Sequence, residues 1–141
     1  EPWFDTVEGM LSHAIFSVPA VKGIEFGMGF GFADKTGSEA NDRMYAENGT
    51  VKCYTNNNGG ILGGITNGMP VIFRAAIKPT PTISIEQQTV DISDMSNTVL
   101  AARGRHDPCI VHRAAVVIES VTALVIADML SAKYGTDWLA K

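Results

Sequence analysis

The longest apolar stretch of the chain, residues 114–130, constrains its fold more than any other feature. A stretch of this length suits either a core helix or a short membrane span. Because it contains Glu119 and Asp128, we favour a helix buried in a folded core over a membrane span. The rest of the chain is therefore expected to pack around this helix.

Local signals set the limits of this helix. Asp107 stands directly before Pro108, and a capping carboxylate followed by proline at the first helical position is typical of a helix start. Gly135 suits the exit of a helix. The pattern predicts a long buried helix from just after Asp107 to about Lys133.

Shorter elements precede the long helix. Apolar residues at helical spacing, with Asp5 as a candidate cap, predict a first helix from Asp5 to Ser17. The segments between the helices read as strands at 21–32 (with a glycine break at 27–29), 71–77, 82–85 and 89–92, and as a long loop at 37–60. This order predicts an α+β fold: an antiparallel β-sheet packed against helices, ending in a long buried C-terminal helix. At 141 residues we expect a single domain, 1–141.

Composition narrows the class of protein. A hydrophobic content of 45% with a net charge of −4 argues against a disordered chain and against a general nucleic-acid-binding protein. Two cysteines, Cys53 and Cys109, are too few for a disulfide scaffold and indicate a reducing compartment, most simply the cytoplasm. No signal peptide is visible at Glu1, and a start without Met is typical of a processed protein or of a piece of a longer one.

The charges are unevenly distributed along the chain. Residues 1–70 hold four basic against eight acidic groups, whereas residues 71–113 hold five basic against four acidic ones. The middle third is therefore where an anionic ligand is best accommodated, unless these are only scattered surface charges.

A glycine-rich segment, residues 59–68, is the first candidate for chemistry, because five of its ten residues are glycine. Glycine lets the backbone approach a ligand closely and lets successive N–H groups turn toward an anion. The alternative is a tight turn between two strands. The segment matches neither a Walker loop nor a dinucleotide fingerprint.

The second candidate is Lys78-Pro79-Thr80-Pro81-Thr82. Two prolines stiffen a backbone that presents a cation and two hydroxyls, an arrangement that can bind a phosphate or a ring carbonyl at low entropic cost. The alternative is a strand end with a polyproline-like exit.

The third candidate is residues 103–109, where Arg105 and His106 precede the long helix. A helix N-terminus attracts anions, and the neighbouring cations strengthen that attraction. Asp107 has two possible roles, as the helix cap or as a proton acceptor, and capping is the simpler one. His112 and Glu119 share a helix face but lack further ligands, so no metal site is predicted.

With these segments in view, the sequence resembles the chorismate synthase family. The resemblance rests on five segments in the family's order: 1–5, 20–27, 59–65, 78–82, and Arg105-His106-Asp107-Pro108-Cys109 with Arg113, Ala114 and Glu119. It covers nearly the whole chain, but the family's Ser-His and Gly-His motifs have no counterpart. The resemblance therefore implies the C-terminal portion of such an enzyme.

The family resemblance also implies an activity. Its members convert 5-enolpyruvylshikimate 3-phosphate to chorismate by 1,4-anti elimination of phosphate, and they require reduced FMN. This implies a cytoplasmic lyase of the shikimate pathway with a phosphorylated small-molecule substrate and no nucleic-acid or membrane partner. It further implies a homo-oligomer, a tetramer, and a chain that is inactive by itself.

Matching positions imply roles for individual residues. Those implied to contact the flavin or a substrate anion are Pro19, Ala20, Gly63, Lys78, Pro79, Thr80, Pro81, Thr82 and Arg105. Asp107 is implied to relay a proton near the flavin N5. We expect the three candidate segments to converge into one pocket wall. The alternative functions are a non-catalytic anion- or nucleotide-binding module and an assembly module derived from such an enzyme.

Three positions depart from the family's pattern. Pro19 stands where many members have Asn, Met28 replaces an acidic residue, and His112 stands where many have Pro. None of the three removes a residue with an implied catalytic role.

Overall fold

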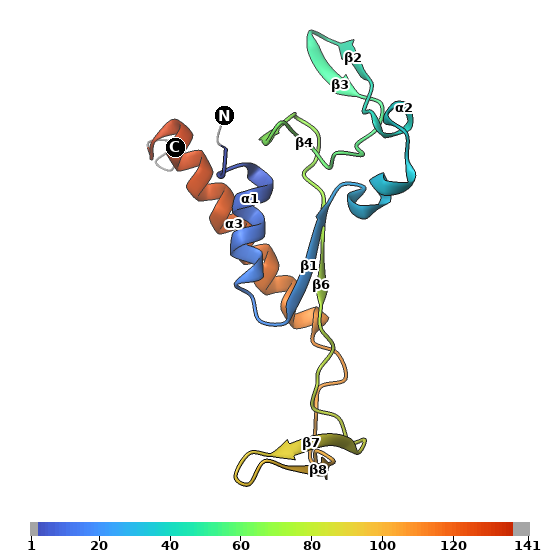
Figure 1. Cartoon of the computed structure of the whole chain (residues 1–141). Coiled ribbons are helices and arrows are strands. Elements are labelled where there is room, and N and C mark those ends of the chain that lie inside the picture. Colours follow the sequence, from blue (N-terminus) through green and yellow to red (C-terminus); the bar gives the residue numbers. More distant parts are fainter. Residues whose placement is uncertain (1–2, 137–141) are drawn as a thin grey trace.

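The computed structural model describes residues 3–136, whose elements are shown in Figure 1. In chain order they are α1 (Val7–Phe16), β1 (Val21–Phe26), the 3-10 helix η1 (Gly29–Asp34), α2 (Gly37–Ala40), β2 (Met44–Glu47), β3 (Thr50–Cys53), β4 (Ile61–Leu62), β5 (Ile65–Thr66), β6 (Phe73–Ile77), β7 (Gln87–Asp91), β8 (Ser96–Leu100) and α3 (Val111–Tyr134).

The first helix, α1, supplies the centre of the core. Val7, Leu11 and Ile15 recur at helical spacing and are all buried, Leu11 and Ile15 completely. Its cap is Thr6, whose hydroxyl accepts a hydrogen bond from the Gly9 amide at 3.0 Å, not the predicted Asp5. A hydroxyl one residue later performs the same capping.

A two-stranded antiparallel sheet of β1 and β6 packs beside α1. Its register pairs Phe26 with Phe73 and Val21 with Ile77, with a bulge between Val21 and Gly23. Partly buried side chains of both strands join the core formed by α1. The first strand is shorter than the predicted 21–32, because the chain turns at Gly27 into the 3-10 helix η1.

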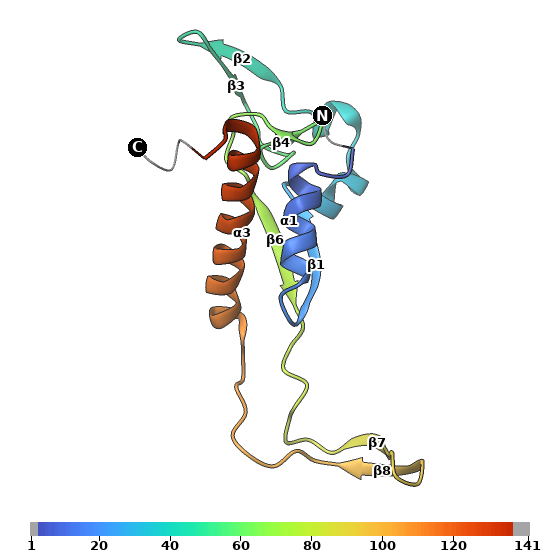
Figure 2. The ribbon, with the colours of Figure 1, turned by 90° about the vertical axis from the view of Figure 1, so that its left-hand side faces the viewer.

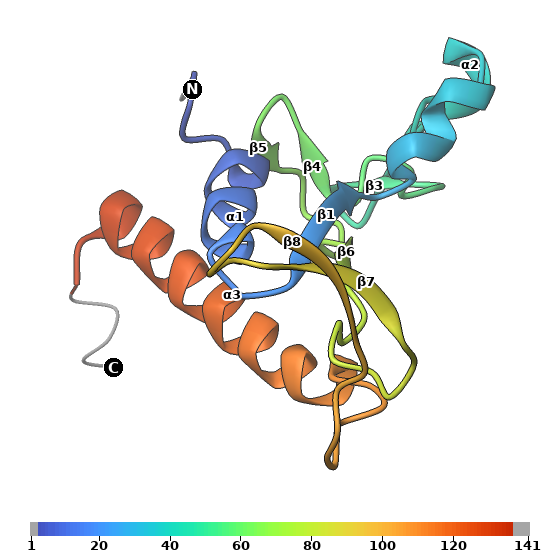
Figure 3. The same ribbon diagram turned by 60° about the horizontal axis from the view of Figure 1, so that its bottom comes forward.

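The long helix α3 was predicted correctly in type and at its C-terminal end, but it begins at Val111 instead of just after Asp107; it lies along α1 (Figures 1 and 3). One stripe, Ile118, Val121, Val125 and Met129, packs against the core. The prediction that this helix is buried is wrong for the described chain, since none of its residues is buried. By length and apolar composition α3 could also cross a membrane, but here one of its sides packs on α1.

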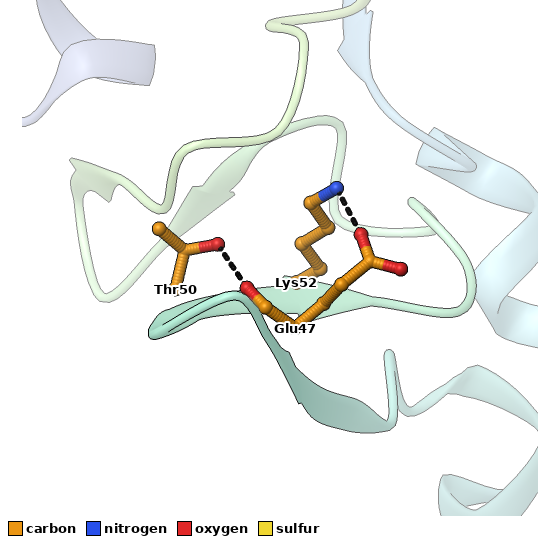
Figure 4. Close-up of polar contacts among 3 residues, drawn as sticks. All are labelled: Glu47, Thr50 and Lys52. Atoms are coloured by element: carbon orange, nitrogen blue, oxygen red, sulfur yellow. Dashed lines mark hydrogen bonds and ion pairs between the residues drawn. The ribbon is translucent and has the colours of Figure 1, made fainter.

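The predicted loop 37–60 contains regular structure. It holds α2 and the hairpin β2–β3, whose turn is Asn48-Gly49 with both residues at positive φ. Asn-Gly is the usual sequence of such a turn. Figure 4 shows the side chains that brace it: Lys52 pairs with the Glu47 carboxylate, and the Thr50 hydroxyl donates to the Glu47 carbonyl at 2.7 Å.

A second hairpin, β7–β8, extends away from the core at the end of the molecule where α3 begins (Figure 2). All of its strand residues are exposed. The predicted strand 82–85 is wrong, because these residues have no partner strand and only lead into β7. The predicted strand 89–92 corresponds to β7.

The α+β class with antiparallel strands and a long last helix is thus confirmed. The strands form four separate two-stranded pairs instead of one sheet: β1 with β6, β2 with β3, β4 with β5, and β7 with β8.

Candidate functional site

Two of the three candidate segments leave the core at the same end of the molecule. The end of β6 and the start of α3 line one open, mainly apolar cavity of about 460 Å³, to which Ile77 and Val111 both contribute. Residues 78–82 continue from Ile77, and residues 103–110 lead into Val111. Figure 1 shows both connections descending from this end toward β7–β8.

Pro19 and Ala20 lie at this end too. The Ala20 carbonyl accepts a hydrogen bond from the Lys78 amide at 2.7 Å, which ties the turn between α1 and β1 to the exit of β6. Ala20 has a φ of 70°, a conformation that is uncommon outside glycine and that costs free energy. The turn therefore holds Ala20 in a fixed, strained geometry beside Lys78.

Unused hydrogen-bonding capacity marks this end of the molecule. Within residues 3–136, the Thr80 Oγ1 and His106 Nε2 atoms are shielded from solvent and have no hydrogen-bond partner. Native proteins satisfy most buried polar groups, so such atoms call for a partner. The same part of the chain places no carboxylate within salt-bridge distance of Lys78 or Arg105. A polar, anionic ligand would give Thr80 Oγ1 and His106 Nε2 a hydrogen-bond partner and would balance the charges of Lys78 and Arg105.

Asp107 is not the cap of the long helix. The helix begins at Val111, and its N-cap, Ile110, makes no side-chain hydrogen bond. Pro108 and Cys109, predicted to form the first helical turn, lie before it. Asp107 instead forms an exposed ion pair with Arg113, with 2.8 Å between Oδ2 and NH1. The Asp107 carboxylate is therefore accessible at the surface, and Asp107 does not cap the helix.

The glycine-rich segment divides into two parts. Gly59 and Gly60 are buried and serve packing: a Cβ on Gly59 would lie 2.4 Å from the Gly27 nitrogen, and one on Gly60 would lie 2.4 Å from the Pro70 carbonyl oxygen. Gly63 and Gly64 form the two-residue turn of the hairpin β4–β5, with φ of 61° and 84°. Gly63 is exposed and has open space beside it, so only this glycine of the pair can admit a ligand to its backbone.

The predicted convergence of all three segments into one pocket wall is wrong within this chain. Gly64 and Ile65 line a pocket with Met129 and Lys133, at the C-terminal end of α3. Asp107 precedes the N-terminus of the same helix, which has 24 residues and is therefore about 36 Å long. The β4–β5 hairpin thus lies beside the C-terminal end of α3, whereas the connections 78–86 and 101–110 lie toward its N-terminal end (Figures 1 and 2).

Sequence reasoning missed Asp42. Its carboxylate accepts four hydrogen bonds: from the Thr55 hydroxyl and the Asn57 amide at 2.7 Å each, and from the Asn58 amide and side chain at 2.9 and 2.8 Å. Burial alone would raise the pKa of Asp42, but the hydrogen bonds from Asn58, Thr55 and Asn57 together lower it. A single aspartate in a polar run carries no sequence signal for this role.

Within residues 3–136 no three His, Cys, Asp or Glu side chains gather in a way that could hold a metal ion. His112 and Glu119, which share a face of α3, are both exposed.

Comparison with known proteins identifies the family. The family profile described as "Chorismate synthase" matches residues 1–131. A chorismate synthase of Dehalococcoides mccartyi is 54% identical over 129 residues, which are 92% of this chain and 35% of that protein. One of Thermococcus gammatolerans is 53% identical over 129 residues, 92% of this chain and 36% of that protein. The chain thus spans about a third of the length of these relatives.

A solved structure agrees with the sequence comparison. A crystal structure of chorismate synthase superposes with a TM-score of 0.74 at 34% identity, covering 95% of this chain and 33% of that chain. The fold and the sequence therefore point to the same family. The chain belongs to the chorismate synthase family.

Proposed function

We propose that this chain forms the C-terminal third of a chorismate synthase, the lyase that eliminates phosphate from 5-enolpyruvylshikimate 3-phosphate. The proposal is supported by the family match over residues 1–131 and by the segments that the relatives share with it. The observation that carries the site is that Ala20 is bonded to Lys78 at the exit of β6, beside the cavity that β6 shares with the start of α3, to which the 103–110 segment leads.

The cofactor of the proposed reaction is reduced FMN, which when bound would supply electron density to the substrate and so help phosphate to leave. The residues at this end fit such a ligand, because Thr80 Oγ1 and His106 Nε2 lack partners within the described residues. Lys78 and Arg105 would balance the negative charge of a phosphate or of the substrate's carboxylates. Residues 78–82, stiffened by Pro79 and Pro81, would hold the ligand at low entropic cost.

Asp107 is proposed as the proton-relaying group. It is exposed, and its ion pair with Arg113 keeps the carboxylate oriented without enclosing it. In the ionised form it can accept a proton from a neighbouring group, the property that general-base catalysis requires. Pro19 and Ala20 are proposed to line the cofactor at this end, and the backbone of Gly63 is proposed to approach a flavin at the opposite end of α3.

The distance between Gly63 and the Lys78–Asp107 end has a consequence for this proposal. One flavin cannot touch both ends of a helix about 36 Å long. The two ends would then serve different sites, or sites completed by other copies of the protein. Sites completed by other copies require an oligomer, and we propose a homo-oligomer, a tetramer as the family implies. We also propose that the protein is cytoplasmic and has no nucleic-acid or membrane partner.

A chimeric enzyme tests the proposed activity. In it, this chain replaces the matching 129 residues of the Dehalococcoides mccartyi relative. We expect the chimera to form chorismate from 5-enolpyruvylshikimate 3-phosphate with reduced FMN, and the 141-residue chain alone to form none. A folded chimera without activity, beside an active parent enzyme, would contradict the proposal and favour a non-catalytic binding or assembly module.

A further inference from the structure

We propose that Asp42 is a positioning residue, which fixes the base of the β4–β5 hairpin and so sets where the backbone of Gly63 meets its ligand. This inference rests on the proposed function, which gives Gly63 a flavin to approach. The proposed site itself uses neither Asp42 nor the loop at 55–58.

Asp42 fixes the loop at residues 55–58 through hydrogen bonds to its carboxylate. One carboxylate oxygen accepts from Thr55 Oγ1 and the Asn57 amide, and the other accepts from both nitrogens of Asn58. All four donors lie 13 to 16 residues further along the chain, so these bonds fix a tertiary contact. Hydrogen bonds to an ionised acceptor are stronger than neutral ones.

The second step joins this loop to the central sheet. The Asn57 carbonyl accepts from the amide of Met28, two residues after the end of β1, at 2.7 Å. The Ile72 amide donates to the Gly59 carbonyl at 3.0 Å, directly before β6. Gly27 packs so closely against the loop that a Cβ there would lie 2.0 Å from the Asn57 carbonyl oxygen. The loop thus links the C-terminal end of β1 to the N-terminal end of β6.

The third step carries the constraint to the hairpin. The Asn56 side chain accepts from the Gly60 amide at 2.7 Å and donates to the Pro70 carbonyl at 2.9 Å. The Asn67 amide donates to the Gly60 carbonyl at 3.0 Å, which closes the base of β4–β5. At the other end of the hairpin, the Gly64 carbonyl accepts from the Val7 amide at 2.9 Å. Gly63 is therefore positioned by one tie to α1 and by the network that begins at Asp42.

An asparagine cannot replace Asp42 in this network. Its amide offers one accepting oxygen, and its NH₂ group would face the Asn58 N–H donors. Asp42→Asn keeps the size of the side chain, so it tests the second accepting oxygen without creating a cavity. Exchanging the two residues, Asp42→Asn with Asn58→Asp, restores the side-chain hydrogen bond in the opposite direction.

The test uses the ¹⁵N-labelled chimeric enzyme, in which this chain stands beside the rest of the relative, and two NMR readouts: amide exchange of residues 57–66, and the shift of the Gly63 amide signal as FMN is added. Losing bonds to a charged acceptor is expected to speed exchange in this segment roughly ten- to hundredfold in Asp42→Asn and Asp42→Ala. The same variants should weaken the Gly63 response to FMN, and the exchanged pair should partly restore both. Asp91→Asn is the matched control, because Asp91 also holds a turn but lies in the distant β7–β8 hairpin.

Exchange that stays unchanged in both Asp42 variants would overturn the positioning role. Faster exchange with an unaltered FMN response at Gly63 would overturn its link to the ligand. If FMN leaves the Gly63 signal of the unmutated chimera unmoved, the proposed role of Gly63 fails, and with it the ligand part of this inference. The exchange data still decide separately whether Asp42 fixes the hairpin.

Discussion

Gly59 and Gly63 lie four positions apart but occupy different surroundings. Gly59 is buried against Gly27 and Ile72, while Gly63 stands at an exposed turn with open space beside it. Both have positive φ, so an added Cβ carries a left-handed penalty of about 1 kcal/mol at either position. Only Gly59 adds a clash with backbone atoms, at 2.4 to 2.8 Å.

We therefore predict that Gly59→Ala lowers the free energy of unfolding by more than about 3 kcal/mol, and Gly63→Ala by about 1 kcal/mol. Urea unfolding followed by circular dichroism measures both. Equal losses in the two variants would contradict the division of the segment into a packing part and a turn part.

Asp42 makes a pH-dependent contribution to stability. Because its folded-state pKa lies below the ordinary value of 3.8, its contribution is present above about pH 3.8 and is lost as the pH falls through the folded-state pKa. We predict that wild-type stability falls in this range more steeply than that of Asp42→Asn, which cannot titrate there. Urea unfolding at a series of pH values between 2 and 6 provides the comparison, and parallel curves for the two proteins would refute the assignment.

At the residue scale, a local sequence pattern does not determine which contacts a residue makes. The sequence marks the segments around Lys78 and Arg105 by their cations, and their role in binding a ligand stays a prediction. The Asp107-Pro108 pair has a typical helix-start sequence, yet the helix begins at Val111 and Asp107 pairs with Arg113. Capping propensity is local, whereas tertiary contacts also decide where a helix begins.

At the element scale, the long helix α3 illustrates what periodicity can predict. Its apolar run marked the helix and its extent, but not which residues face the core. The inward stripe includes Val121, which packs on the core, whereas Val116 is 63% exposed. The same residue type on one helix therefore offers a matched comparison of the two faces.

We predict that Val121→Ala destabilises the chain by about 1 to 2 kcal/mol, because it removes packed methyl groups. Val116→Ala should stay within about 0.5 kcal/mol, since the side chain is mostly in water and alanine favours helix. Thermal unfolding of the two variants measures the difference. A larger loss from Val116→Ala would contradict this assignment of the two faces of α3.

Short strands were harder to predict than helices. The Asn48-Gly49 turn is a recognisable hairpin signal, and with it the predicted loop 37–60 could have been read as β2–β3. By contrast, nothing local separates residues 82–85 from a strand, because a strand exists only where a partner is available. Pairing is decided by distant residues, which a single sequence does not reveal.

At the scale of the whole molecule, much apolar surface lies open. The outer side of α3 exposes Val117 and Leu124, and the cavity between α3 and β6 is lined mainly by apolar residues. Only seven hydrophobic residues of the described chain are buried, so the core is small. Exposed apolar patches of this kind favour association.

We predict that the chain self-associates in solution. Sedimentation equilibrium should give an apparent mass above 15.1 kDa that rises with concentration. Leu124→Glu, on the outer face of α3, should lower that mass, because it places a charge in the exposed patch. A mass of 15.1 kDa at every concentration would mean that this surface stays hydrated.

The fold class could be predicted at this scale, but the distances between segments could not. The α+β order of elements followed from hydrophobic patterning and turn residues. Gly63 and Asp107 are far apart because the β4–β5 hairpin packs beside the C-terminal end of α3. This tertiary contact has no local sequence signal.

The most direct measurement compares chorismate formation by the chimeric enzyme with and without Asp107→Asn. Because Asp107 forms only an exposed ion pair, the change should alter stability by less than about 1 kcal/mol. The account predicts a fall in turnover of at least about a hundredfold, as expected when a group that transfers a proton is lost. Turnover at the parental rate would mean that Asp107 takes no part in the chemistry.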